Sequence, residues 1–328
     1  MDCLRITQGS PAEVTSAGTY DATYCRCAVS MTDDAAGARG YFVGPTSALD
    51  NVVTGETMWW HCEMQFAEDA STVRDIIQFI DVATGYPWLS IQSGPQGYVS
   101  LRYNSGTGAV PVWTIIPGTQ IYHNHATKNV VDIMWTLGSP HTAALYWNNN
   151  FLASGTFTQA GATSIGGFTL RALSDSRPSR WSQMLCTVGI PTVLAKVLSA
   201  RPSAAGNSNT FASGVFGDIS EIVYNDVTAL MSSAAAQKYT MACSDITVPT
   251  GYTIQSVFLW ARAKHGGASP TNLKQVIRSS AVDYPSPNGV GMNLGMHPIG
   301  AQFATNPAGG AWTQATFNAI EIGGESAA

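Results

Sequence analysis

The segment Val130–Phe157 constrains the fold more than any other part of the chain. It holds three runs of alternating apolar and polar residues, Val130–Leu137, Thr142–Trp147 and Phe151–Phe157, separated by a Gly-Ser-Pro turn and by a polar tip of three asparagines. Apolar residues at every second position predict strands with one buried face, and the turn residues stand where antiparallel strands must reverse. The segment therefore predicts consecutive antiparallel hairpins.

Short runs of the same kind recur along most of the chain. Strands this short, punctuated by Gly, Pro and Asn, are typical of an all-β sandwich. We predict an N-terminal arm at 1–18, a sandwich over 19–228 and a small β-domain over 229–328. The further strands expected in the sandwich are Tyr20–Met31, Thr57–Ala67, Asp75–Val82, Trp88–Gln92, Tyr98–Tyr103, Trp113–Ile116, Phe168–Leu173, Trp181–Val188 and Asp218–Tyr224.

The last hundred residues predict a second unit that is built mainly of strands and ends in one short helix. Thr313 can cap a helix over Gln314–Ile320, which Gly323 would end. Trp312 stands next to the cap, where an apolar residue can pack on the helix, so we expect Trp312 and Phe317 to be structural anchors. The strands expected before the helix are Lys238–Ala242, Thr253–Lys264, Lys274–Ser280 and Gly300–Ala304.

The centre of the hairpin series resembles a known class of sandwiches. Its pattern Leu-Tyr-x-Asn-x-x-x-Leu, at residues 145–152, is similar to the laminin-G/concanavalin-A-like jelly rolls. The resemblance implies an all-β fold: an antiparallel jelly-roll sandwich followed by a small β-domain with one short C-terminal helix. Members of this class bind, coat and decorate more often than they catalyse.

A second resemblance covers roughly the last third of the chain. The closing segment Phe303–Gly323, with its Asn-Pro-x-x-Gly-x-Trp-Thr motif, is similar to the end of a family of virion structural proteins of tailed bacteriophages. Ser256–Tyr284 and Gly217–Met241 resemble the same family. The resemblance implies a non-enzymatic virion component and supplies no functional residues.

Composition narrows the classes of partner. Charged residues make up 11% of the chain, against about 25% in an average globular protein, while 45% of residues are apolar and nine are Trp. Such a chain is not disordered, and its sparsely charged surface suits contacts with further copies of itself. The net charge is −5 with no basic run, so we expect no nucleic-acid partner.

No segment reaches the roughly 20 apolar residues that span a bilayer. The N-terminus lacks a signal-peptide pattern, which predicts synthesis and assembly in a cytosol.

The carboxylates lack the arrangement that glycoside hydrolysis requires. A retaining pair needs two carboxyl groups about 5–5.5 Å apart in one cleft. The nearest candidates are Glu63 with Glu68 and Asp69, and Asp218 with Glu221, and neither set has the spacing of a catalytic pair on one strand. No nucleophile elbow or phosphate-binding loop occurs either. We therefore predict that the protein is not an enzyme.

No cofactor is expected, with calcium as the alternative. His123 and His125 alternate like ligands on one strand, but Asp132 is the only acidic residue near them, so we interpret them as part of a polar loop. Asp33, Asp34 and Asp81 offer hard oxygen ligands at the expected sandwich rim, where a calcium ion could bind.

The six cysteines show no zinc spacing and are interpreted as small buried hydrophobes, with a disulfide formed outside the cell as the alternative.

Aromatic side chains are the candidates for contact with a carbohydrate or a partner. A flat ring can stack on the apolar face of a sugar. We single out Tyr146, Trp147, Trp88 and Trp113. Strand alternation places Tyr146 and Trp147 on opposite faces, so one of them should point outward. The alternative is that the tryptophans serve the two cores and subunit contacts.

Together these features give one hypothesis and two alternatives. The hypothesis is a non-enzymatic structural component of a tailed-phage virion, at a head decoration, collar or neck, tail or baseplate position, assembled in the host cytoplasm. Its partners would be copies of itself and other virion proteins. The first alternative is a glycan-binding adhesin that attaches to a host-surface glycan, and the second is a glycan-degrading enzyme.

Overall fold

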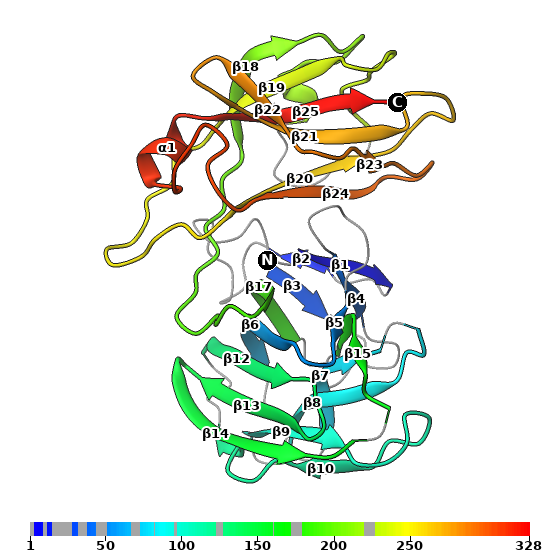
Figure 1. Ribbon diagram of the computed structural model, residues 1–328, viewed down its shortest axis with the longest axis vertical. Coiled ribbons are helices and arrows are strands. Elements are labelled where there is room, and N and C mark those ends of the chain that lie inside the picture. Colours follow the sequence, from blue (N-terminus) through cyan, green and yellow to red (C-terminus); the bar gives the residue numbers. More distant parts are fainter. Residues whose placement is uncertain are drawn as a thin grey trace. The chain divides into compact units, whose positions relative to one another are not determined.

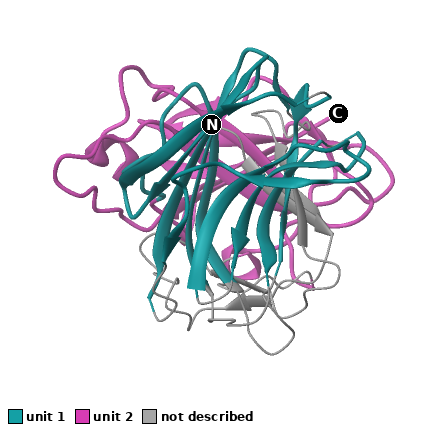
Figure 2. Ribbon diagram, turned by 90° about the horizontal axis from the view of Figure 1, so that it is seen from below, with its two compact units in different colours: residues 1–44, 49–197 teal, residues 45–48, 198–328 magenta. Residues whose placement is uncertain are grey.

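The chain forms two compact units in the computed structural model. Unit 1 comprises residues 1–44 and 49–197, and unit 2 comprises residues 45–48 and 198–328 (Figure 2). The structure describes residues 3–8, 12–14, 28–31, 38–43, 51–66, 73–81, 83–94, 97–122, 127–159, 161–171, 179–219 and 227–328. Each unit is described by itself.

The division between the units differs from the predicted boundary at residue 228. β18 (Pro202–Asn209) pairs with β19 (Lys238–Cys243), so residues placed in the sandwich by the sequence belong to unit 2. The predicted arm at 1–18 also contributes to the sandwich. β1 (Cys3–Gln8) pairs with β4 (Ala38–Val43), and β2 (Ala12–Val14) pairs with β3 (Ala28–Met31). Strand pairing, which local sequence does not show, decides both points.

Unit 1 is an all-β jelly-roll sandwich of two antiparallel sheets, as predicted (Figure 1). Within the described residues the eight-stranded sheet has the order β1, β4, β16 (Gly167–Leu170), β7 (Arg74–Ile80), β8 (Pro87–Ser93), β9 (Tyr98–Asn104), β10 (Trp113–Ile115), with β11 (Ile121–Tyr122) also on β9. The seven-stranded sheet has the order β14 (Asn150–Phe157), β13 (His141–Trp147), β12 (Asn129–Thr136), β6 (Thr57–Phe66), β17 (Ser179–Val188), β3, β2. β15 (Ser164–Ile165) pairs with β5 (Val52–Val53).

The core of unit 1 lies between the two sheets and follows the alternation seen in the sequence. β12, β13 and β14 are consecutive antiparallel strands, which confirms the predicted hairpins. Trp60 of β6 is fully buried and meets Phe79 of β7 edge to face at 5.3 Å and Phe168 of β16 at 4.9 Å. Burying one such side chain stabilises the fold by about 1.5–3 kcal/mol. These aromatic contacts join the two sheets.

Unit 2 packs a six-stranded sheet with a two-stranded ribbon. The sheet has the order β18, β19, β25 (Glu321–Ala327), β21 (Asn272–Ser279), β22 (Val282–Pro285), with β23 (Val290–Gly291) also on β21. The ribbon consists of β20 (Val257–Ala263) and β24 (His297–Phe303). A 3-10 turn at Phe216–Asp218 and one α-helix complete the unit. Its buried cluster is Ile246, Val257, Leu259, Ile277, Ala301, Phe303, Trp312, Phe317 and Ile320.

The short C-terminal helix starts where the sequence predicts it and ends earlier. α1 (Gln314–Asn318) is capped by Thr313, whose hydroxyl accepts a hydrogen bond from the Thr316 amide at 3.1 Å. Gly323 does not end the helix, because it lies inside β25. A side chain at Gly323 would overlap the carbonyl oxygen of Tyr239 on β19, so glycine permits this strand pairing. Most of the predicted strand Asp218–Tyr224 lies outside the described residues.

Candidate functional site: a pocket beside Trp88

Three loops of unit 1 border an open cavity of about 590 Å³. The first loop joins β7 to β8, the second follows β9, and the third leads into β15. Loops held at the end of rigid strands are common places for binding sites. The residues that line the cavity are Asp81, Ala83, Thr84, Tyr86, Trp88, Gly106, Thr107, Gly108, Gly161, Thr163 and Ser164.

Asp81 organises two of the three loops. One carboxylate oxygen accepts hydrogen bonds from the amide and hydroxyl of Thr84, at 2.8 and 2.9 Å, and the other accepts from the Ser164 hydroxyl at 2.8 Å. Burial alone would raise the pKa of Asp81, but the hydrogen bonds from Ser164 and Thr84 outweigh it, and the pKa lies below its usual value. Asp81 is therefore an ionised group that fixes the hydroxyls of Thr84 and Ser164 at the pocket wall.

Asn104 joins the first loop to the second. Its side chain is fully buried, and its amide nitrogen donates to the carbonyl oxygens of Pro87 at 3.1 Å and Thr107 at 3.2 Å. Its amide oxygen accepts from the backbone nitrogens of Gly106 at 2.9 Å and Val112 at 3.0 Å. All four hydrogen-bonding positions of this amide are filled. The pocket is thus held in shape without a ligand.

Two aromatic rings form the apolar wall of the pocket. Tyr86 and Trp88 meet edge to face, with ring centroids 6.4 Å apart. Tyr86 is 37% exposed, whereas Trp88 is 4% exposed, and the Trp88 indole nitrogen has no hydrogen-bond partner among the described residues. A side chain at Gly108 would overlap the Tyr86 ring, and Gly161, at φ +101°, lies against Trp88. Glycine therefore lets the backbone approach both rings.

The four aromatic candidates from the sequence have different environments. Trp88 lies in the pocket wall. Both Trp88 and Trp147 are 4% exposed and belong to the core of unit 1, but Trp147 lines no part of the pocket. Tyr146 is half-buried against Trp59, with ring centroids 5.6 Å apart. Trp113 lies under the guanidinium of Arg102, 4.6 Å from the ring centroid.

The pocket is not evident from the sequence, although Asp81 and Trp88 are both candidates there. Thr84, Tyr86 and Ser164 were not singled out, because the loops that carry them are far apart in the chain. The usable signal was local: Asp81 followed by Thr84 and Gly85 predicts a turn in which the carboxylate binds the backbone. That signal predicts a turn and no cavity.

A second polar cluster, on the eight-stranded sheet, is closed on itself. The Asp75 carboxylate accepts hydrogen bonds from Arg102 Nε and Gln78 Nε2, both at 2.9 Å, and from the Ser90 hydroxyl. The Asp75 and Arg102 side chains are 11% and 12% exposed. With its oxygens engaged by neighbours on three adjacent strands, Asp75 connects the sheet and offers no free acid or base.

The remaining carboxylate candidates also have structural partners. Glu63 pairs with Lys128 at 2.9 Å, and Asp218 accepts from the Val215 amide at 2.7 Å. Asp132 accepts hydrogen bonds from His61 at 2.8 Å and Thr192 at 2.7 Å. The other candidates for acid–base chemistry or metal binding lie outside the described residues: Asp33, Asp34, Glu68, Asp69, His123, His125 and Glu221.

Metal-ligating and reactive groups are not gathered within the described part of the chain. There, no three His, Cys, Asp or Glu side chains lie close enough to hold a metal ion. Burial raises the pKa of the Cys62 thiol to about 12, so this thiol stays protonated at neutral pH. Of the helices that the structure describes, none has the length and apolar character needed to cross a membrane.

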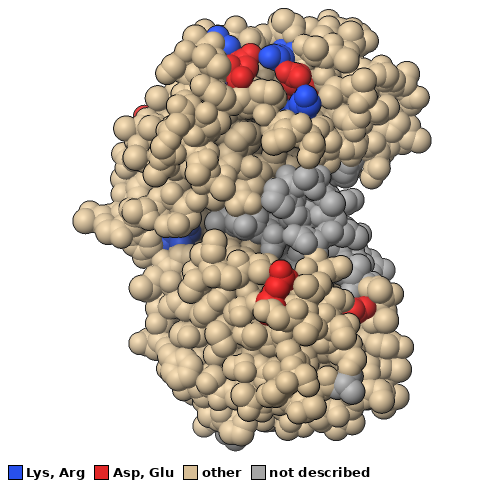
Figure 3. Space-filling model, in the orientation of Figure 1, with Lys and Arg blue, Asp and Glu red and all other residues tan. Residues whose placement is uncertain are grey.

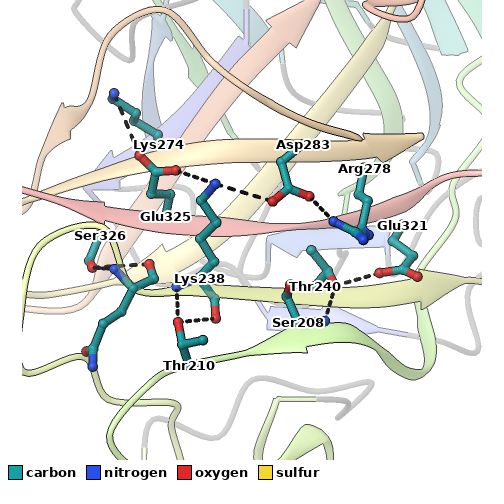
Figure 4. A network of polar contacts seen from close by, with 11 residues as sticks. Ser208, Thr210, Lys238, Thr240, Lys274, Arg278, Asp283, Glu321, Glu325 and Ser326 are labelled. Atoms are coloured by element: carbon teal, nitrogen blue, oxygen red, sulfur yellow. Dashed lines mark hydrogen bonds and ion pairs between the residues drawn. The ribbon is translucent and has the colours of Figure 1, made fainter. Parts of the chain in front are cut away.

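Charged side chains gather on the six-stranded sheet of unit 2 (Figures 3 and 4). Lys238 lies 3.2 Å from both Asp283 and Glu325, and Arg278 lies 2.5 Å from Asp283. Lys274 approaches Glu325 at 3.8 Å. Glu321, which interacts with Arg278, is the third acid beside these three bases, so the cluster presents no excess of one charge to a ligand (Figure 4).

We expect this cluster to make unit 2 sensitive to acid. Burial would raise the pKa of Asp283, but hydrogen bonds from Arg278 and Lys238 outweigh burial and hold it below the ordinary value of 3.8. The pKa of Glu321 is lowered in the same way, against burial, by Thr240 and Asn207. A carboxyl with a lowered folded-state pKa stabilises the fold above its unfolded pKa, and this is lost as the pH falls through the folded pKa.

Urea unfolding of unit 2 at pH 7, 5, 4 and 3 tests this expectation. The free energy of unfolding should stay level down to pH 5 and fall below pH 4. Asp283→Asn should make the fall shallower, by about 1 kcal/mol at most, because the groups are partly exposed. An unchanged slope in the variant would show that Asp283 does not carry the effect.

The chain was compared with known families, curated proteins and solved structures. No family pattern and no curated protein matches it. It is similar to an endo-β-1,4-glucuronan lyase from the fungus Trichoderma reesei, at 12% identity and a TM-score of 0.41, over 56% of this chain and 89% of that one. It is also similar to alginate lyase A1-II′ of polysaccharide lyase family 7, at 14% identity and a TM-score of 0.37, over 51% of this chain and 82% of that one. A third similar structure is the globular domain of T. cruzi calreticulin, at 8% identity and a TM-score of 0.38, over 55% of this chain and 79% of that one.

These similarities correct two predictions from the sequence. The similar structures include polysaccharide lyases, which contradicts both the non-enzymatic virion component and the expected lack of enzymatic activity. We do not carry either prediction forward. Similarity at this level transfers neither activity nor site residues to this chain. Self-association of the chain stays a prediction.

Proposed function

We propose that unit 1 binds a saccharide in the pocket beside Trp88. The observation that carries the proposal is the combination in one cavity of the paired Tyr86 and Trp88 rings with hydroxyls held by Asp81. Ligand sites combine an apolar wall with a few fixed polar groups. A sugar has both matching surfaces, because its ring presents apolar C–H groups and its edge carries hydroxyls.

The charge of the lining supports an uncharged ligand. Asp81 is the one charged residue among those that line the cavity, and no Lys or Arg is present in that set. A ligand with a carboxylate would face this anion without a compensating cation, in a partly buried place where repulsion is weakly screened. A sugar hydroxyl, in contrast, can donate to the oxygens of Thr84 and Ser164, whose own protons are held by Asp81, and can accept from the hydroxyl of Thr107.

The size and preorganisation of the pocket fit a small ligand. A cavity of about 590 Å³ lies within the range of about 300–1,000 Å³ that is usual for ligand pockets. The hydrogen bonds of Asn104 and Asp81 hold the loops in place, so little conformational entropy is lost when the ligand binds. Both features favour binding of a short stretch of an oligosaccharide.

Replacing Tyr86 by alanine tests the proposal. The binding of four hexasaccharides is measured by titration calorimetry. Three are neutral, built from glucose, xylose or N-acetylglucosamine, and the fourth is the charged hexamer of mannuronate. At least one neutral hexasaccharide should bind. Tyr86→Ala should raise its Kd at least tenfold, since half of the aromatic wall is lost. Tyr98→Ala is the matched control, because Tyr98 is a 39% exposed tyrosine in the same unit, also paired edge to face, and outside the pocket.

Three outcomes would overturn the proposal. In the first, no neutral hexasaccharide binds at millimolar concentration. In the second, Tyr86→Ala and Tyr98→Ala have equal effects on the Kd. In the third, only the mannuronate hexamer binds, which would contradict the charge argument from Asp81.

A further inference from the structure

The two-stranded ribbon of unit 2 has one buried face and one face that carries exposed aromatic rings. Val257 and Leu259 of β20 point into the core of unit 2, together with Ala301 of β24. Alternation along the strand therefore turns Phe258 and Trp260 the other way. Trp260 is 41% exposed, so this indole is not part of the core of either unit.

A glycine lets these two rings lie close to the ribbon, tilted by 49° to each other. Trp260 is paired with Gly300 across the two strands, and the Phe258 and Trp260 ring centroids are 4.8 Å apart. A Cβ atom at Gly300 would overlap the Phe258 ring and lie 3.1 Å from the Trp260 ring. Both rings therefore lie over the glycine, and Phe258 supports Trp260 from one side. We call Phe258, Trp260 and Gly300 the aromatic platform.

Polar groups border the platform along the same ribbon. Gln302 is paired with Phe258 across the strands, and its amide nitrogen donates to the Ser256 hydroxyl at 3.0 Å. That bond orients the Gln302 amide beside the platform. Arg262, two residues beyond Trp260 on the same strand face, stands at the other end. The two rings thus lie between hydrogen-bonding side chains.

The small size of the platform decides between a protein partner and a small ligand. A stable protein interface covers about 800 Å² on each side, with a central apolar patch. Two aromatic rings offer at most about 150–250 Å² each, and part of each ring is already covered by the other or by Gly300. That area is far too small for a stable dimer and matches the face of one sugar ring.

We propose that the aromatic platform of unit 2 is a second saccharide-binding site, which stacks a neutral pyranose ring on Trp260. In β-linked glucose and N-acetylglucosamine the ring hydrogens are axial, so both faces of the sugar ring present C–H groups to an aromatic ring. Gln302 then lies beside the equatorial hydroxyls at the edge of the sugar. This site does not depend on the pocket of unit 1, because it belongs to the other unit.

The test observes Trp260 directly in the full chain. In a ¹⁵N correlation spectrum, the indole N–H signal of Trp260 is the one that disappears in Trp260→Phe. Cellohexaose or the N-acetylglucosamine hexamer should shift this signal in a saturable way, and should do so equally in Tyr86→Ala. Trp260→Ala should weaken calorimetric binding of the same probe at least tenfold in the Tyr86→Ala background.

Two further variants sharpen the test. Gly300→Ala keeps both rings but displaces Phe258, and should weaken binding at least fivefold. A thermal unfolding curve checks that this variant is folded. If Gly300→Ala is unfolded, Trp260→Ala alone tests the platform. Tyr252→Ala is the matched control, since Tyr252 is a 37% exposed aromatic residue of unit 2 outside the platform, and it should leave the Kd unchanged.

The proposal is overturned if no neutral probe shifts the Trp260 signal at 10 mM. It is also overturned if Trp260→Ala and Tyr252→Ala bind alike, or if the shift is lost in Tyr86→Ala, which would place the sugar in unit 1. A Trp260 shift in the wild type, with a Kd that Tyr86→Ala leaves unchanged, would overturn the function proposed for unit 1 and leave this one standing.

Discussion

Replacing Trp312 by alanine should lower the free energy of unfolding of unit 2 by about 3–5 kcal/mol. The indole is 4% exposed, its Nε1 donates to the Phe303 carbonyl oxygen at 2.8 Å, and its ring meets Phe317 edge to face. The substitution removes this buried surface and also leaves the Phe303 carbonyl without its donor, which adds about 1–3 kcal/mol if water cannot replace it. A domain of this size has only about 5–15 kcal/mol in total.

Urea unfolding and limited proteolysis of the full chain measure this effect. Unit 2 should become susceptible to protease, while unit 1, with its separate core, should stay resistant. Trp260→Ala is the matched control, since it removes an indole of the same unit that is 41% exposed, and it should change the free energy by about 0.5 kcal/mol or less. Equal effects of the two substitutions would contradict the role given to Trp312.

Replacing Asp132 by alanine should destabilise unit 1 by about 3–5 kcal/mol. The carboxylate is fully buried and accepts hydrogen bonds from His61, which is 2% exposed, and from Thr192. Because β6 and β12 carry His61 and Asp132 directly opposite each other, the pair connects two central strands of the seven-stranded sheet. Removal of the carboxylate leaves His61 buried without this partner.

A graded series separates this network from ordinary packing. Thr192→Val removes one donor to Asp132 and should lower the free energy of unfolding by about 1 kcal/mol. Asp132→Asn keeps an acceptor for His61, so its loss in the free energy of unfolding should lie between the losses of Thr192→Val and Asp132→Ala. Thermal unfolding of the three variants gives the order. An alanine variant as stable as the valine variant would show that His61 finds another partner at little cost.

The fold could be predicted from the sequence, whereas the function predicted from it was wrong. Hairpin periodicity predicted an all-β sandwich, the resemblance of residues 145–152 implied its jelly-roll class, and Trp88 was named as a contact candidate. The pocket could not be predicted, because Asp81 and Ser164, which meet in one wall, are 83 residues apart in the chain. The platform escaped prediction for a related reason: the sequence shows Trp260 in a strand but not Gly300 beneath it.

The sequence by itself determined the features that depend on local pattern. Alternation over Val130–Phe157 specifies β12, β13 and β14, because a strand with one buried face repeats every second residue. Thr313 and Thr316 likewise specify the start of α1, because their side chains satisfy the free amides of the first turn.

Only the tertiary structure decided which strands exist where the pattern is weak. β18 has no large apolar side chain, and β25 holds two consecutive glycines, so neither shows strand periodicity. β25 nevertheless lies between β19 and β21, because Gly323 lets the Tyr239 carbonyl come close, and the pairing satisfies the backbone groups of all three strands. Such pairing depends on residues that are distant in the chain, so local sequence does not predict it.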